Sequence, residues 1–190
     1  RIPKPSPGVG GPCLTKDPFI LNRSFIKNKI NSELIIGARN VNIKVLKNIY
    51  KKTLKILQKN GKDIKKCKIF ISGFAFKGYP ETSDMRSSTT IDFLNMLKKN
   101  KVKNIFGHDF KVSKKDISEL GIKYCSFESG IKNADATFIM NNSLRYKEFK
   151  IFSLVNKMKK PGLFFDCWQI FQPDEIKNIP GINYTSVGSK

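Results

Sequence analysis

"ISGFAFKGYPETSDMRSSTTIDFL", residues 71 to 94, is the stretch of sequence that indicates the fold. An apolar run that starts at Cys67 leads into a glycine-containing turn, and Ser87 and Ser88 then provide a cap for a helix. A strand that passes through such a turn into a helix N-terminus forms a natural site for phosphate. Lys77 adds a cation to the positive end of the helix dipole.

The turn does not match either of the common nucleotide motifs. Gly73 and Gly78 form a G-x-x-x-x-G pattern that lacks the Lys-Ser/Thr of a P-loop, and the turn is not G-x-G-x-x-G. We therefore expect a phosphate or diphosphate group that is held without a metal ion. The alternative is that Gly73 only permits close packing and that Lys77 is solvated.

Downstream of this stretch, short apolar runs alternate with helical segments. Strands that alternate with helices imply βαβ units and a largely parallel, doubly wound sheet with helices on both faces. Helices are expected at Ser88–Lys99 and in "FSLVNKMKK". The predicted strands lie in "CKIFISGFAF", "KNIFGHD", "GIKYCS", "ADATFIMNN", "GLFFDCW" and "INYTSVG".

Upstream, residues 32 to about 60 form one long amphipathic helix. Apolar residues recur every three or four positions, and further apolar residues widen the stripe. Gly61 is a stop signal, and we place a domain boundary near Asp63. The expected class is α/β, with a long central helix in residues 1–62 and a Rossmann-like doubly wound parallel sheet in residues 63–190. The stripe contains Leu34, Ala38, Val41, Val45, Leu46, Ile49, Tyr50, Leu54 and Leu57.

Composition excludes several classes of protein. No run of about 18 apolar residues occurs and no segment reads as a signal peptide, so we expect a soluble, cytoplasmic protein with no membrane partner. The sequence starts at Arg1 rather than at Met, and we interpret it as a fragment. His108 is the single histidine, and the cysteines form no C-x-x-C pair, so neither a metal site nor a disulfide framework is indicated. The four cysteines are Cys13, Cys67, Cys125 and Cys167.

The charge is strongly positive but scattered. The 36 Lys and Arg against 15 Asp and Glu give a formal charge of +21, which is typical of polyanion-binding proteins. Lysines occur in every segment, and arginines clustered with aromatic residues, as expected of a nucleic-acid surface, are missing. The sequence therefore favours a solvated lysine-rich surface over a nucleic-acid partner.

A second informative stretch is "PSPGVGGPCLTKDPFIL", residues 5 to 21. Cys13 lies there among glycines and prolines, which places it on a loop where its thiol can reach a ligand. Lys16 would favour the nucleophilic thiolate. The alternative, a small buried apolar residue, stays open from local features alone.

Together these stretches resemble the nucleotide-sugar dehydrogenase family, whose members oxidise UDP-glucose or UDP-N-acetylmannosamine at C6. "PGVGGPCLTKDPFIL" resembles the family's nucleophile loop, and "GFAFK" followed by "TSDMRSS" resembles the start of its UDP-binding domain. "ARNVN", residues 38 to 42, falls where the family carries its central dimerisation helix. The resemblance spans nearly the whole chain.

The resemblance implies a reaction and its catalytic residues. The family removes four electrons in two NAD-dependent steps, which turn a primary alcohol into a uronate through an aldehyde held as a thiohemiacetal and then a thioester. Cys13 would be the nucleophile, and Asp17 would orient or deprotonate the water that hydrolyses the thioester. It also implies a homodimer through the long helix.

The resemblance further assigns binding residues. Phe76 and Lys77 match contacts to the nucleotide-sugar, Lys16 lies on the nicotinamide side, and Arg86 matches an arginine that reaches NAD bound by another domain. A salt bridge with Asp84 is the alternative role of Arg86. The loop that would wrap the nucleotide-sugar comprises Lys4, Pro5, Ser6, Pro7, Gly8, Val9 and Gly10.

Some positions depart from the family pattern. Cys167, Trp168 and Gln169 follow Asp166 where the glucose enzymes carry a substrate-binding arginine. Pro12 and the "DPFIL" ending, residues 17 to 21, are closer to the N-acetylhexosamine branch. We therefore favour UDP-N-acetylmannosamine as the substrate. Trp168 is at least as well explained as a core aromatic. His108 is given no catalytic role.

The family's NAD-binding Rossmann domain has no counterpart in these 190 residues, so this chain alone should not turn over. Two other interpretations remain open: a noncatalytic UDP-binding and dimerisation module, and a basic nucleic-acid-binding protein, for which no motif is present.

Overall fold

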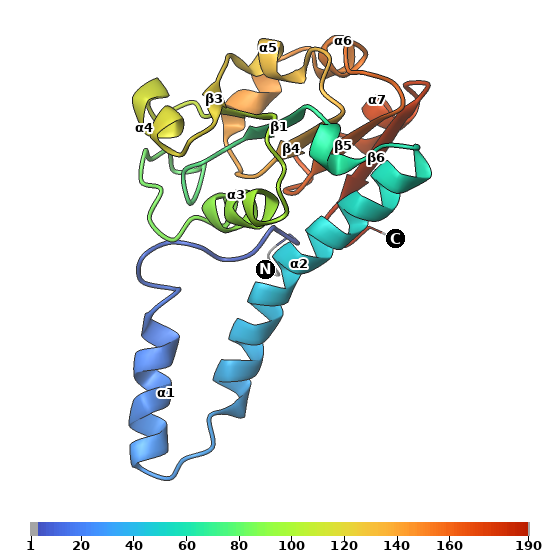
Figure 1. Ribbon diagram of the computed structural model, residues 1–190. Helices are drawn as coiled ribbons and strands as arrows, with labels where there is room; N and C mark the ends of the chain where they lie inside the picture. Colours follow the sequence, from blue (N-terminus) through green and yellow to red (C-terminus); the bar gives the residue numbers. More distant parts are fainter. Residues whose placement is uncertain (1–3, 190) are drawn as a thin grey trace.

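Six parallel strands form one sheet, as the alternating pattern predicts (Figure 1). The computed structural model describes residues 4–189. The predicted ranges 1–62 and 63–190 include residues 1–3 and residue 190, which lie outside the described residues. The strand order β3-β2-β1-β4-β5-β6 is that of a doubly wound sheet, so the predicted fold class is confirmed. The strands are β1 (Ile69–Ser72), β2 (Ile105–His108), β3 (Lys123–Tyr124), β4 (Ala136–Ile139), β5 (Gly162–Asp166) and β6 (Ile182–Ser186).

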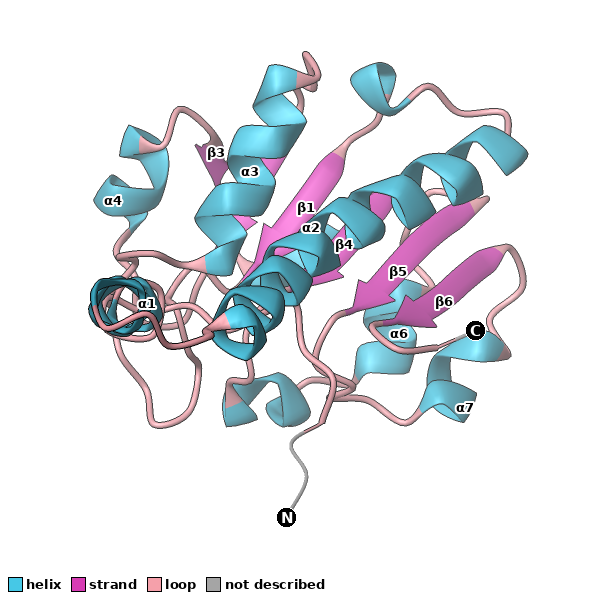
Figure 2. Cartoon of the chain, turned by 90° about the horizontal axis from the view of Figure 1, so that it is seen from below, coloured by secondary structure: helices cyan, strands magenta, loops and turns pink. Residues whose placement is uncertain are grey.

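Helices cover both faces of this sheet. On β1, Ile69 and Ile71 face one apolar cluster and Phe70 faces the other, which explains why the strand is a continuous apolar run. Figure 2 shows α2 and α3 lying across one face of the sheet. The first face is covered by α2 (Glu33–Lys59), α3 (Thr89–Lys99) and α4 (Lys114–Glu119), and the second by α5 (Phe127–Ile131), α6 (Ile151–Val155) and α7 (Pro173–Lys177).

The helix α2 has the predicted extent, one residue short of the expected limits at each end. Its C-terminus is closed by Gly61, whose φ of 70° is accessible to glycine. The N–H of Gly61 donates to the carbonyl of Gln58 at 2.9 Å, and that of Lys62 donates to the carbonyl of Leu57 at 2.9 Å. These two bonds form a Schellman motif, which satisfies carbonyls that the helix leaves unpaired.

Only the second half of α2 belongs to the core of the α/β domain. Its buried residues are Leu46, Ile49, Thr53 and Leu57, whereas Leu34 and Val41 in the first half are 87% and 64% exposed. The first half pairs instead with α1 (Asp17–Lys27), and the two helices project from the domain as a hairpin (Figure 1). The apolar stripe of α2 therefore extends beyond the part that packs in the core of the α/β domain.

Several helices were not predicted. The helix α1 begins at Asp17, with Pro18 in its first turn, in a stretch that the sequence analysis assigned to a loop. No residue of α1 is buried, and its apolar residues Phe19, Ile20, Leu21 and Ile26 are exposed. The helices α4, α5 and α7 are five or six residues long, and the short 3-10 helices η1 (Ile64–Lys66) and η2 (Leu144–Glu148) are shorter than two turns, too short for a helical period.

Two smaller expectations are met. Ser88 caps α3, because its hydroxyl accepts from the N–H of Thr90 at 3.2 Å. Cys67, which starts the apolar run noted in the sequence, lies two residues before β1 and is buried. Among residues 4–189, no helix has the length and apolar character needed to cross a membrane.

Candidate functional site

The loops after β1 and β4 meet at the carboxyl edge of the sheet, where the chain order reverses. Ligands of open α/β sheets bind in the crevice at this switch point. Gly73, directly after β1, has a φ of 99°, and a Cβ on it would lie 2.6 Å from Cγ of Asn141 after β4. A side chain at this position would push the two loops apart, so the glycine is needed for their close approach.

Asp109, directly after β2, fixes the shape of this edge and was not recognised from the sequence. Its side chain is buried, and its Oδ2 also accepts from Nδ2 of Asn141 at 3.3 Å. One carboxylate thus joins the loops that follow β1, β2 and β4. The backbone N–H groups that donate to it, at 2.7 to 3.0 Å, are those of Phe74, Ala75, Lys111 and Val112.

Phe76 and Lys77 lie on the turn that Asp109 anchors. The N–H of Phe76 donates to the carbonyl of Asp84 at 2.9 Å, and the ammonium of Lys77 lies 5.4 Å from the Phe76 ring centroid. Asn142 holds the next residues, because its Oδ1 accepts from the N–H of Gly78 at 2.8 Å. The cleft beside Lys77 is small, about 10 Å³, and the Lys77 side chain is half-buried.

The glycine-rich segment before Cys13 lies against this turn. A Cβ on Gly11 would lie 3.1 Å from the Phe76 ring, and the N–H of Gly11 donates to the carbonyl of Ser87 at 3.1 Å. The structure therefore brings Gly11, the residue after the predicted loop of residues 4–10, against the turn of Phe76, sixty-five residues later in the chain.

Cys13 lies on an exposed turn next to these segments, as its glycine-rich surroundings predict. Its carbonyl accepts from the N–H of Lys16 at 3.0 Å and from that of Asp17 at 2.8 Å. The side chains of Lys16 and Asp17 are exposed and lie 3.5 Å apart. Cys13, Lys16 and Asp17 therefore lie on one backbone turn at the start of α1.

Arg86 forms the ion pair that the sequence analysis weighed as its alternative role. Its Nη2 lies 2.7 Å from Oδ2 of Asp84, and its guanidinium is 75% exposed. The hydrogen bond and charge of Asp84, and to a smaller degree the charge of Cys13, raise the pKa of Arg86.

Comparison with known proteins identifies the family. The model of the UDP-glucose/GDP-mannose dehydrogenase family, UDP binding domain, matches residues 70–173, which is more than half of the chain. This chain belongs to that family. The match begins in β1 and ends at the start of α7, so it covers most of the sheet.

Similar proteins include a UDP-N-acetyl-D-mannosamine dehydrogenase of Methanococcus aeolicus, which is 30% identical over 152 residues. That match covers 79% of this chain and 31% of the relative. A UDP-D-ManNAc dehydrogenase structure from Pyrococcus horikoshii superposes with a TM-score of 0.81 at 26% identity, over 99% of this chain and 40% of that one. An NDP-N-acetyl-D-galactosaminuronic acid dehydrogenase of Methanosarcina mazei, at 23% identity, has the same fold, with a TM-score of 0.81 over 98% and 40% of the two chains. The present chain thus spans about a third of the length of the curated relatives it matches.

The sheet of this dehydrogenase-family chain does not fit NAD at the usual Rossmann position. A dinucleotide fold needs a short glycine turn after β1 and a free acid after β2 for the ribose. Here Gly73 and Ser88 are separated by a long turn, and the acid after β2, Asp109, already accepts hydrogen bonds from the loop after β1. Among residues 4–189, no group of three His, Cys, Asp or Glu side chains is arranged to hold a metal ion.

Two residues that the sequence analysis discussed beside the site lie in the interior. The indole N–H of Trp168 donates to the carbonyl of Met140 at 2.9 Å, and its ring packs against the core. Asp166 is buried under the same loop and accepts from the N–H of Phe171 at 2.9 Å. Burial raises the pKa of Asp166, and the backbone hydrogen bonds oppose this rise. Trp168 is thus a partly buried aromatic that packs against the core.

His108 is also buried, at the end of β2. Its Nδ1 lies 3.0 Å from Oγ of Ser72, which lies 2.9 Å from the hydroxyl of Tyr146. The ring meets Phe110 edge to face at 4.7 Å between centroids. Burial lowers the pKa of His108 to about 4.

We expect the free energy of unfolding to fall on acidification because of His108. Between pH 6.5 and about 4 the unfolded chain binds a proton that the folded chain does not, so stability decreases as the pH falls, by about 1.4 kcal/mol per unit. From pH 7.5 to pH 5 the loss is about 2 kcal/mol, measured by urea unfolding. A His108→Phe variant should lack this part of the pH dependence. An equal slope in both proteins would contradict the assignment.

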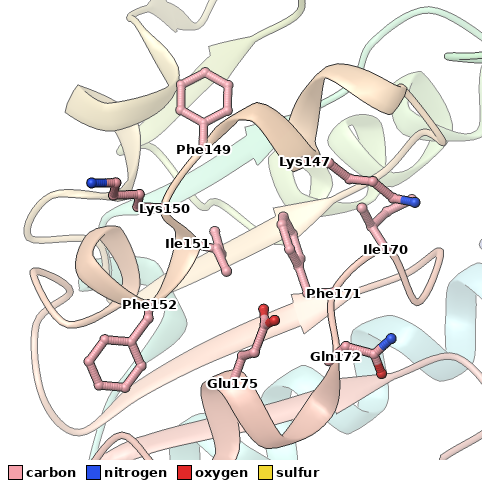
Figure 3. A pocket seen from close by; sticks show the side chains of 9 residues that line it. All are labelled: Lys147, Phe149, Lys150, Ile151, Phe152, Ile170, Phe171, Gln172 and Glu175. Atoms are coloured by element: carbon pink, nitrogen blue, oxygen red, sulfur yellow. The ribbon is translucent and has the colours of Figure 1, made fainter.

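A larger cavity of about 440 Å³ lies away from these residues, between η2, α6 and α7 (Figure 3). The ring of Phe171 and the carboxylate of Glu175 turn toward its middle. None of the residues predicted from the sequence to form the site lines it. The residues that do are Lys147, Phe149, Lys150, Ile151, Phe152, Ile170, Phe171, Gln172 and Glu175.

Proposed function

We propose that this chain binds the UDP-sugar and supplies the nucleophile in an NAD-dependent UDP-sugar 6-dehydrogenase. The observation that carries the proposal is the approach of the Lys4–Gly10 loop, the Phe76–Lys77 turn and the exposed Cys13 turn to one another. Residues 63–190 would form the UDP-sugar-binding domain, and residues 1–62 the nucleophile loop and the pairing helix.

The substrate we propose is UDP-N-acetylmannosamine. It is supported by the Methanococcus and Pyrococcus dehydrogenases named for this sugar and by the absence of the glucose-enzyme arginine after Asp166. The backbone of residues 4–10 would wrap the nucleotide-sugar, and Lys77 would offset the charge of the diphosphate. Glycines in that loop allow the backbone to come close to the ligand.

Cys13 would act on the aldehyde at C6. Its sulfur adds to the carbonyl carbon, which restores a tetrahedral carbon that carries a hydride and gives a thiohemiacetal. Loss of that hydride gives a thioester, and water then releases the uronate and the free thiol. Asp17, at the start of α1, would orient or deprotonate this water.

The cofactor in this proposal is NAD, which accepts the two hydrides. It would be held mainly by a part of the enzyme outside this chain, since the turn after β1 does not fit a dinucleotide. Lys16 and Arg86 would contact it from this chain. Both side chains are exposed, and Lys16 lies three residues after Cys13 in the chain, which supports that role.

We also propose a homodimer formed through α2. The exposed apolar residues of its first half have no cover within residues 4–189, and symmetric pairs are the commonest soluble oligomers. Sedimentation of the full-length enzyme at micromolar concentration should give the mass of a dimer. A monomer at that concentration would rule out the proposed dimer through α2.

Calorimetric titration with UDP tests the binding site directly. A Lys77→Ala variant should bind UDP about 10- to 100-fold more weakly, because a charge-assisted contact contributes roughly 1.5–3 kcal/mol. A Lys103→Ala variant is a matched control, since this exposed lysine precedes β2 at the opposite edge of the sheet. Equal affinities for the Lys77→Ala variant and the native chain would place the site elsewhere.

A further inference from the structure

Asn42 of α2 pairs with the backbone of the loop that precedes Cys13. Its Oδ1 accepts from the N–H of Val9 at 2.6 Å, and its Nδ2 donates to the carbonyl of Val9 at 3.2 Å. A side-chain amide carries a donor and an acceptor side by side, so it can satisfy both backbone groups of one residue. The contact resembles one rung of a β-ladder between a helix side chain and an extended loop.

The glycines beside this contact show how closely the loop lies on its supports. Gly8 has a φ of 121°, and a Cβ on it would lie 3.3 Å from Oδ1 of Asn42 and 3.3 Å from Cγ2 of Thr89. A Cβ on Gly10 would lie 2.7 Å from the carbonyl oxygen of Ser87. The loop is therefore fixed from two directions: by α2 through Asn42, and by the start of α3.

Asn42 lies where the two halves of α2 meet. Val41, just before it, is 64% exposed on the projecting half, and Leu46, one turn later, is buried in the core. A helix transmits a change in one half to the next turn because its backbone hydrogen bonds are continuous. If a partner covered the projecting half of α2, or if that half tilted, the change would therefore be passed to the loop at Val9 through Asn42.

We propose that Asn42 is a positioning residue that holds the Lys4–Gly10 loop in its binding shape and couples nucleotide-sugar binding to the pairing of α2 with a second copy. The inference rests on the proposed function. A loop that is ordered before the ligand arrives avoids the entropy of ordering on binding. Pairing of α2 with a second copy would restrict the motion of the projecting half of α2. Because Asn42 joins this helix to the loop, the loop would also move less.

An Asn42→Leu variant removes both hydrogen bonds while it keeps the number and branching of the side-chain heavy atoms. It should bind UDP about tenfold more weakly than the native full chain in calorimetry, and the amide protons of Val9 and Gly11 should exchange faster with deuterium. Asn42→Asp, which keeps the acceptor and loses the donor, should fall between the two. Asn48→Ala, an exposed asparagine on the same helix, is the matched control and should bind UDP as the native chain does.

A double-mutant cycle tests the coupling to pairing. Val41→Lys places a charge on the exposed stripe and should weaken both self-association and UDP binding. In the Asn42→Leu background, Val41→Lys should have no further effect on UDP affinity. The inference would be overturned if the losses of UDP binding free energy in Val41→Lys and Asn42→Leu were additive in the double variant. It would also be overturned if Asn42→Leu bound UDP with native affinity. A native chain that fails to bind UDP would instead refute the proposed function, whereas unchanged exchange at Val9 and Gly11 in Asn42→Leu would refute the positioning role by itself.

Discussion

A Cys13→Ser substitution is expected to abolish net uronate formation by the full-length enzyme while UDP-sugar binding survives. An oxygen adduct is a poorer acyl intermediate than a thioester, and the proposed UDP contacts lie on other residues. The measurement is NADH formation with UDP-N-acetylmannosamine, together with calorimetric titration of the variant with UDP. Full turnover by a Cys13→Ala enzyme would refute the catalytic role and favour a noncatalytic binding module.

The same thiol can be tested in the chain itself. Cys13 is exposed, whereas burial raises the pKa of Cys67 and that of Cys125 to about 11 each. At pH 8 only about one in a thousand of such buried thiols is ionised, and the thiolate is the form that reacts. Peptide mapping after brief alkylation should find Cys13 modified first, and UDP-sugar should protect it. Preferential modification of Cys67 would be incompatible with this structure.

An Asp109→Leu substitution is expected to lower the free energy of unfolding by about 3–5 kcal/mol, because four backbone N–H groups at the carboxyl edge would lose their buried charged acceptor. Asp109→Asn, which keeps the size and one acceptor oxygen, should lose about half as much. Urea unfolding measures both changes.

The control for Asp109→Leu is a substitution of an exposed acidic residue that forms only a surface ion pair. Glu119 is exposed and lies 3.9 Å from the ammonium of Lys115, so Glu119→Ala should change stability by less than about 0.5 kcal/mol. Equal stabilities for Asp109→Leu and Glu119→Ala would show that the carboxylate does not organise the edge.

The sheet was predictable because its strands are short and apolar on both faces. Runs such as Ile69–Ser72 and Gly162–Asp166 are buried throughout, so they stand out from the lysine-rich segments between them. The long helix was predictable because its stripe persists over 27 residues. By contrast, α1 has no buried face, and the five-residue helices α5, α6 and α7 bury one to three residues each, too few for a repeated pattern.

The site was predictable only in part, for a related reason. Cys13, Phe76 and Lys77 lie in stretches with a recognisable residue pattern, so resemblance could single them out. Asp109 and Asn42 act through hydrogen bonds to backbone groups of distant residues, and these bonds leave no local pattern. Their partners become apparent only when the loops meet in three dimensions. The roles of the predicted site residues remain predictions that the experiments above test.

The uninterrupted course of α2 restricts how this region can change in length. One inserted residue would turn everything before it by 100° and shift it by about 1.5 Å, so Asn42 would point away from Val9 and the projecting stripe would change direction. The connection from Asn28 to Ser32, at the tip of the hairpin, carries no such constraint. Insertions and deletions among relatives should therefore gather at that tip and be missing between Asn42 and Gly61, where the helix acts as a fixed spacer.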